Sequence, residues 1–209
     1  MFGWIYTLLV SIAVLSVYWW TLFPSIPGGD AGEIASEACQ LGTAHPPGYP
    51  LFTLMNHVAS SGGFILGGDS PGSAAMRMNL LSAAMGAASA GLIGASSLHL
   101  QRLTGSTGGE CSYPFLTAAT GSFFFAFSPH VWEYSLGTEV FALNNFFCAL
   151  IVYQVLRTYG AYENYRASGA PQDKTILRRW ALVGALTAGL TLANQHASLL
   201  LLVVAVPFA

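Results

Sequence analysis

The sequence predicts an all-α membrane protein, a polytopic bundle of about five helices that cross the bilayer. Of its 209 residues, 54% are hydrophobic and only 8% are charged, whereas soluble domains carry about a quarter charged residues. The hydrophobic residues gather in long runs separated by short polar segments. The formal net charge of −2 excludes the basic face that a nucleic-acid-binding protein needs.

The first predicted span covers residues 4–23. This run contains no charged residue, and about 20 residues at about 1.5 Å each cross the hydrocarbon layer of about 30 Å. It ends in Tyr18, Trp19 and Trp20, which is typical of the aromatic belt at a membrane interface. The run lacks the basic start and the small-residue cleavage site of a signal peptide, so we expect it to be retained.

A polar loop over residues 24–75 follows the first span. Asp30 and Glu33 have the spacing of an N-cap and its partner acid, which predicts the start of a short helix. The alternative to capping is a functional acid pair just outside the membrane. Prolines and a glycine after His45 fix a rigid turn, either a structural bend or a loop that binds an anionic headgroup or a sugar. Residues 51–66 predict an interfacial helix, with a re-entrant segment as the alternative.

Four further spans are predicted over residues 76–101, 113–128, 140–157 and 180–207. The first of these is rich in Ala, Gly and Ser, which allows close helix packing. The last contains three polar residues, Asn194, Gln195 and His196. Polar groups at that depth face a cavity, or they bond to another helix. The chain ends inside this last run, so we expect it to be the N-terminal portion of a longer protein.

The distribution of Lys and Arg predicts the orientation of the bundle. Most of the seven basic residues lie between positions 157 and 179, and basic loops stay in the cytoplasm. The loop after Arg102 should also be cytoplasmic. The loop 24–75 and the segment 129–139 then face outward, and Arg77 is the one base expected on that side.

The outward segments carry a group of acidic and histidine side chains: Asp30, Glu33, His45, His130, Glu133 and Glu139. Carboxylates accept hydroxyl protons, and aromatic faces, here Trp132 and Tyr134, pack on sugar rings. The combination favours a sugar-handling site, although it would also suit a cation pathway. Glu139 is placed to act as an acid at the N-terminus of the span that follows it.

Several motifs resemble those of one known family, the transmembrane protein 260 family. They are PSIPGGDAGE (24–33), GTAHPPGYPLF (42–52), RMNLLSA (77–83), EVFALNN (139–145) and GLTLANQH (189–196). The resemblance extends from Phe23 to about His196, nearly the whole chain. Two features differ from the family: Ala31 stands where many relatives have Ser, and family members have more spans and a C-terminal lumenal part.

The resemblance implies a protein O-mannosyltransferase of the endoplasmic reticulum, or of the inner membrane in a bacterium, with the multi-span GT-C architecture. The implied donor is mannose linked to polyprenyl or dolichyl phosphate. The implied acceptor is Ser or Thr on immunoglobulin-like (IPT) domains. GT-C enzymes need an acidic residue in the first lumenal loop, which corresponds here to Asp30 with Glu33 as its nearest companion.

From this resemblance we expect a single inverting displacement in which Asp30 is the general base. Glu33 either orients Asp30 or completes the capping box, and a divalent metal between the two acids is an open alternative.

Donor binding is expected from His45, Arg77, Glu133, Glu139 and His196, with Arg77, then His45, steadying the departing phosphate. An interfacial anchor is the other interpretation of Arg77. Two rival functions remain: a transporter component whose path is lined by residues 194–196, and a non-catalytic subunit or truncated isoform.

Overall fold

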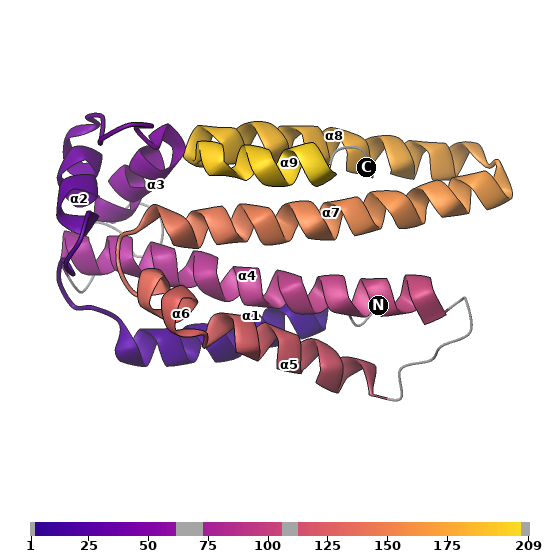
Figure 1. Ribbon diagram of the computed structural model, residues 1–209, viewed down its shortest axis with the longest axis horizontal. Helices are drawn as coiled ribbons and strands as arrows, with labels where there is room; N and C mark the ends of the chain where they lie inside the picture. The colour runs from indigo at the N-terminus through magenta and orange to yellow at the C-terminus, as the bar shows by residue number, and fades with distance from the viewer. Residues whose placement is uncertain (1–2, 62–72, 106–112, 206–209) are drawn as a thin grey trace.

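The computed structural model describes residues 3–61, 73–105 and 113–205, and all regular secondary structure in these ranges is helical. This confirms the predicted fold class. Four helices are long and apolar enough to cross a membrane, as judged by length and composition within the described ranges: α1 (Gly3–Thr21), α4 (Ala74–Gly105), α7 (Val140–Ser168) and α8 (Pro171–Asn194). The long helices lie side by side, with α4 between α1 and α7 (Figure 1).

Glycines on α4 let the neighbouring helices approach its backbone closely. A Cβ atom placed on Gly91 would lie 2.7 Å from the carbonyl oxygen of Thr7 on α1, and one on Gly94 would lie 2.6 Å from the Tyr6 ring. Both distances are shorter than a van der Waals contact, so only glycine fits. The close packing expected from the small-residue composition of this helix is therefore present.

Replacing Gly91 by alanine should lower the free energy of unfolding by about 1–3 kcal/mol, because the new methyl group meets backbone that cannot move alone. Gly121 is the matched control, since it is exposed and a Cβ atom there meets nothing within 4 Å. Thermal unfolding in detergent measures both variants. Equal melting temperatures for the two would contradict the tight α1–α4 contact.

The expected span at 113–128 is shorter in the structure. Helix α5 (Pro114–Ala126) has 13 residues and covers about 20 Å, less than the hydrocarbon thickness. It ends near Pro129, whose ring and missing N–H prevent continuation of the helix. A separate short helix, α6 (Pro129–Ser135), begins there.

The expected span at 180–207 is divided into two segments that run in opposite directions. Helix α8 ends at Asn194, and Gln195 is extended, with φ −151° and ψ 126°. A 3-10 turn, η1 (His196–Ser198), then leads into α9 (Leu199–Ala205), which returns along α8 (Figure 1). The Ser198 hydroxyl donates to the side-chain oxygen of Asn144 on α7 at 2.6 Å. Residues 194–196 therefore lie at a helix end, where polar groups are ordinarily found, and not in mid-span.

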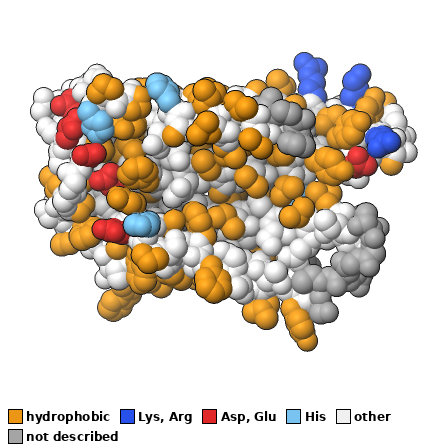
Figure 2. Space-filling model, in the orientation of Figure 1, with side chains coloured by type: hydrophobic (Ala, Val, Ile, Leu, Met, Phe, Trp, Pro, Cys, Tyr) orange, Lys and Arg blue, Asp and Glu red, His pale blue; other side chains and the backbone are white. Residues whose placement is uncertain are grey.

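The expected cytoplasmic loop at 157–179 is also largely helical. Helix α7 continues to Ser168, and α8 begins at Pro171 after Gly169, whose φ of 63° closes the turn. Basic side chains gather at this end of the molecule in the view of Figure 2, while acidic and histidine side chains gather at the opposite end. This separation matches the predicted alternation of the loops.

Two short helices, α2 (Ala31–Gln40) and α3 (Pro50–Ser60), lie across the acidic end of the bundle (Figure 1). The helix predicted after the acid pair is thus confirmed. The helix predicted over 51–66 is present as α3, and residues 62–66 lie outside the described ranges. Phe52 of α3 is fully buried in a cluster with Val140 and Leu143 of α7, so α3 is held on the core by apolar packing.

Candidate active site

Asp30 stands at the start of α2 without capping it. Its backbone is helical, with φ −81° and ψ −5°, and its side chain makes no capping hydrogen bond. The carboxylate side chain is 64% exposed. The structure therefore does not show the capping box that the spacing of Asp30 and Glu33 allowed, and it leaves the Asp30 carboxylate facing outward.

Glu33 binds the turn that contains His45. The backbone N–H of His45 donates to Oε1 of Glu33 at 2.7 Å, and Nδ1 of His45 lies 3.1 Å from Oε2. These hydrogen bonds, the backbone one first, lower the pKa of Glu33 below its usual value. Glu33 is thus held in its charged form and fixes both the backbone and the ring of His45.

His45 is the central member of a carboxylate cluster made up of Asp30, Glu33, His45, Tyr49 and Glu139. Its Nε2 atom lies 3.2 Å from the hydroxyl of Tyr49 and 3.9 Å from Oδ2 of Asp30. The expected orientation of Asp30 by Glu33 is therefore indirect, through the imidazole ring.

Tyr49 is a member of the cluster that the sequence reasoning did not identify. It is buried, at 8% exposure, and has a left-handed backbone with φ 45° just before α3. Burial, then the charges of Asp30, Glu139 and Glu33, raise the pKa of its phenol. Its position four residues after His45, in a proline-rich turn, was the available signal.

Glu139 reaches the same cluster from the start of α7. It occupies the N-cap position of α7, the helix terminus predicted for it, and its side chain makes no capping hydrogen bond there. Its carboxylate instead accepts a hydrogen bond from the backbone N–H of Asp30. Burial and then the Asp30 charge raise the pKa of Glu139. Gly29, with φ 74°, permits this approach, because a Cβ atom there would lie 3.3 Å from Oε1 of Glu139.

Asn79 on α4 joins the two outer segments that carry Asp30 and Glu139. Its amide nitrogen donates to the carbonyl oxygens of Phe23 at 2.9 Å and Ser25 at 2.8 Å. Its side-chain oxygen accepts from the hydroxyl of Thr138 at 2.7 Å. Asn79 and Thr138 are both fully buried, so the hydrogen bond between them is protected from water. Sequence reasoning missed it because an asparagine inside an apolar helix does not indicate its partners.

The remaining predicted site residues lie apart from the cluster. Arg77 donates to the carbonyl oxygens of Ala59, at 3.2 Å, and Ser60. It therefore binds the C-terminal end of α3, about 16 Å from the end that carries Tyr49. Glu133 is exposed on α6, and His196 is exposed in η1. The structure thus brings together Asp30, Glu33, His45 and Glu139, and it does not bring the other three to them.

No group of three or more His, Cys, Asp or Glu side chains that could hold a metal ion is found within the described residues. Both carboxylate oxygens of Glu33 contact His45, so of the two acids expected to hold a metal only Asp30 has an exposed carboxylate without such contacts to the His45 backbone. The divalent metal stays a prediction.

Replacing His45 by alanine should bring the pKa of Glu33 part of the way back to its usual value. The return is partial because the leading cause of the low pKa is the hydrogen bond from the backbone N–H of residue 45, which alanine retains. When the pKa of a glutamate is lower in the folded state than in the unfolded state, the folded state is stabilised at pH values above the unfolded pKa. This stabilisation is lost as the pH falls through the folded pKa. The stability difference between wild type and variant should therefore shrink at acid pH. Thermal unfolding over a pH series measures this stability difference. A difference that grows on acidification would contradict the stabilising contact between Glu33 and His45.

Comparisons with known proteins support the family that the sequence motifs indicated. The family described as "Protein O-mannosyl-transferase TMEM260 N-terminal domain" matches residues 30–209. A Mus musculus relative named "Protein O-mannosyl-transferase TMEM260" is 36% identical over 199 residues, which cover 95% of this chain and 24% of that protein. A Dictyostelium discoideum relative named "Protein O-mannosyl-transferase tmem260" is 30% identical over 203 residues, 96% of this chain and 22% of that protein.

The chain spans about a quarter of the length of these curated relatives. No solved structure matches it. The family match begins at Asp30 and includes every residue of the carboxylate cluster described above. The chain therefore belongs to the TMEM260 family and corresponds to its N-terminal domain.

Proposed function

We propose that this domain carries the catalytic loop of a GT-C type glycosyltransferase that moves mannose from a polyprenyl- or dolichyl-phosphate carrier to Ser or Thr hydroxyls of proteins. The names of the two relatives support the reaction class. The observation that carries the proposal is the Asp30 carboxylate, which is exposed, is not used as a helix cap, and is surrounded by His45 and Glu139.

In the proposed step, Asp30 accepts the proton of the acceptor hydroxyl while the hydroxyl oxygen bonds to the anomeric carbon of mannose. The bond from that carbon to the lipid phosphate breaks, and the phosphate leaves with the electron pair, so the anomeric configuration inverts. Phosphate is a good leaving group and needs no general acid. Positioned proton transfer of this kind contributes about 10²–10⁴-fold to a rate.

The neighbours of Asp30 have complementary roles in this proposal. Glu33 fixes His45 through the backbone and the ring. His45, when protonated, places a positive charge 3.9 Å from Asp30, where it stabilises the departing phosphate. Glu139 holds the Asp30 backbone from the side of α7, so it serves as a positioning residue.

The proposed location is the membrane of the endoplasmic reticulum, with α2 and α3 on the lumenal side. The four apolar helices support a membrane location, and the basic residues at the other end favour the cytoplasm for that end. The proposed acceptors are lumenal immunoglobulin-like (IPT) domains, in keeping with the resemblance stated above.

The test uses membranes in which the protein has been expressed. Radiolabelled dolichyl-phosphate mannose and a purified IPT domain are added, and label on Ser or Thr of the acceptor is counted. Transfer from the lipid-linked donor, and none from a sugar nucleotide when lipid-linked sugar synthesis is blocked, is the expected result. Solute flux through liposomes without any transfer would instead favour the transporter.

A further inference from the structure

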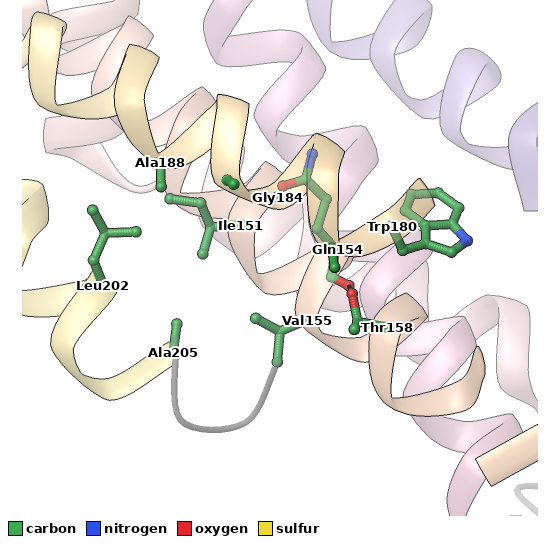
Figure 3. Close-up of a pocket in the computed structure, with 11 residues that line it drawn as sticks. Ile151, Gln154, Val155, Thr158, Trp180, Gly184, Ala188, Leu202 and Ala205 are labelled. Atoms are coloured by element: carbon green, nitrogen blue, oxygen red, sulfur yellow. Dashed lines mark hydrogen bonds between the residues drawn. The ribbon is translucent and has the colours of Figure 1, made fainter. Parts of the chain in front are cut away.

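A cavity of about 240 Å³ lies between α7, α8 and α9. Figure 3 shows Trp180 at one end of it and Leu202 and Ala205 of α9 at the other, with Ile151 of α7 between them. Residues of α7 and α8 form most of its wall, and Leu202 and Ala205 of α9 complete it. The cavity lies along the bundle, away from the carboxylate cluster at the start of α7.

The walls of the cavity suit a hydrocarbon chain. They consist mainly of small and aliphatic side chains, and a Cβ atom placed on Gly184 would meet nothing within 4 Å. Two alanines of α8 that line the cavity, Ala181 and Ala185, are exposed. Because α8 is long and apolar enough to span the bilayer, this open side is suited to contact lipid, and an acyl chain can enter there.

The end of the cavity marked by Trp180 is rimmed by positive charge. The Arg157 guanidinium stacks over the Trp180 ring, 4.6 Å from its centroid, and donates to the Tyr153 hydroxyl at 2.9 Å. Arg178 and Arg179 directly precede Trp180 and are exposed. Tryptophan marks the headgroup level of a membrane, and basic pockets between membrane helices on the cytoplasmic side bind anionic headgroups.

We infer that this cavity and its rim bind one anionic phospholipid. One acyl chain lies between α7, α8 and α9, and the phosphate contacts Arg157 and Arg178 beside Trp180. Charge complementarity selects this occupant: a zwitterionic lipid would fill the apolar part but gain less at the arginines, and a packed protein helix would have to desolvate them. The site is at the end of the bundle opposite Asp30, so the inference does not rest on the proposed mannose transfer.

The experiment is a native mass spectrometry titration of the purified 209-residue chain in non-ionic detergent. Phosphatidylglycerol and phosphatidylcholine with the same acyl chains are the first two probes, and a polyprenyl phosphate is the third. We expect one tightly retained phosphatidylglycerol. The double variant Arg157→Gln/Arg178→Gln should weaken its binding about thirtyfold, at about 1 kcal/mol per basic residue near the surface. Arg166→Gln, which removes an exposed arginine paired with Glu163 at the same end, should leave binding unchanged.

The cavity itself is tested by filling it. Gly184→Leu projects a side chain into open space within the cavity, and Ala188→Phe fills it from the next turn of α8. Both should abolish retention of phosphatidylglycerol. Gly189→Leu is the matched control, because Gly189 is exposed on the same helix, has open space at its Cβ position and does not line the cavity.

Three outcomes would overturn the inference. Equal retention of the two phospholipids would remove the role of charge. Binding that survives in both cavity-filling variants would remove the role of the cavity. A clear preference for polyprenyl phosphate over phosphatidylglycerol would assign the cavity to the lipid that carries the sugar.

Discussion

Replacing Asp30 by asparagine is expected to lower mannose transfer by about 10²–10⁴-fold, the usual contribution of a positioned general base. Asparagine keeps the size of the side chain and cannot accept the proton. The backbone N–H that binds Glu139 is retained, and no helix cap is lost because Asp30 makes none. The change should therefore appear in the turnover number and leave the melting temperature close to that of wild type.

The matched control is Glu37→Gln, a change of the same kind on the same helix, one turn beyond Glu33. It should leave transfer unchanged. Transfer by Asp30→Asn within a few-fold of wild type would eliminate Asp30 as the base. Loss of transfer in both variants would point to a general effect of charge on α2 and not to proton transfer at one atom.

Replacing Asn79 by leucine is expected to lower the free energy of unfolding by about 3 kcal/mol and to abolish transfer. The substitution leaves the carbonyl oxygens of Phe23 and Ser25 and the hydroxyl of Thr138 without their partner. A buried group that loses its hydrogen bond costs about 1–3 kcal/mol. Thr138 is such a group, whereas Phe23 and Ser25 are exposed and their carbonyl oxygens cost less. The segments that carry Asp30 and Glu139 are then no longer joined to α4, so the geometry of the site is lost as well.

A graded series separates this effect from simple misfolding. Thr138→Val removes one of the three hydrogen bonds and should lower stability by about 1–2 kcal/mol, with partial loss of transfer. Asn164→Ala changes an exposed asparagine near the basic end of α7 and should have no effect on either. Thermal unfolding and protease cleavage of the 24–30 segment are the measurements. If the Asn79→Leu variant is as stable as wild type and its 24–30 segment resists the protease, Asn79 does not hold the two outer segments together.

Several parts of the candidate site could be predicted from the sequence. Asp30, Glu33 and His45 lie within sixteen residues of one another, so local spacing and the prolines after His45 were sufficient to place them together. Their individual roles were not predictable to the same degree. The sequence allowed a capping box, whereas in the structure Glu33 binds His45 and Asp30 makes no capping hydrogen bond, because the chain turns at Leu41, after α2, and brings His45 back to Glu33.

Arg77 is a residue whose position the sequence could not predict. As the one basic residue expected on the outer side, it was the natural candidate for binding a phosphate. In the structure its guanidinium donates to the last carbonyl oxygens of α3, groups that a helix end always leaves without intrahelical partners. A sequence cannot show which helix end will come within reach of an arginine on another helix.

The sequence by itself determined the membrane-embedded, all-helical class, the first span and the gathering of acids at one end of the molecule. These properties follow from hydrophobicity, charge and turn residues, which act over a few neighbouring positions. Only the tertiary structure decided that Glu139 and Tyr49 join Asp30, that Asn79 bonds to Thr138 across 59 residues, and that the chain reverses after Asn194. Such contacts depend on how the helices pack, because side chains distant in sequence meet only where close packing brings their backbones together.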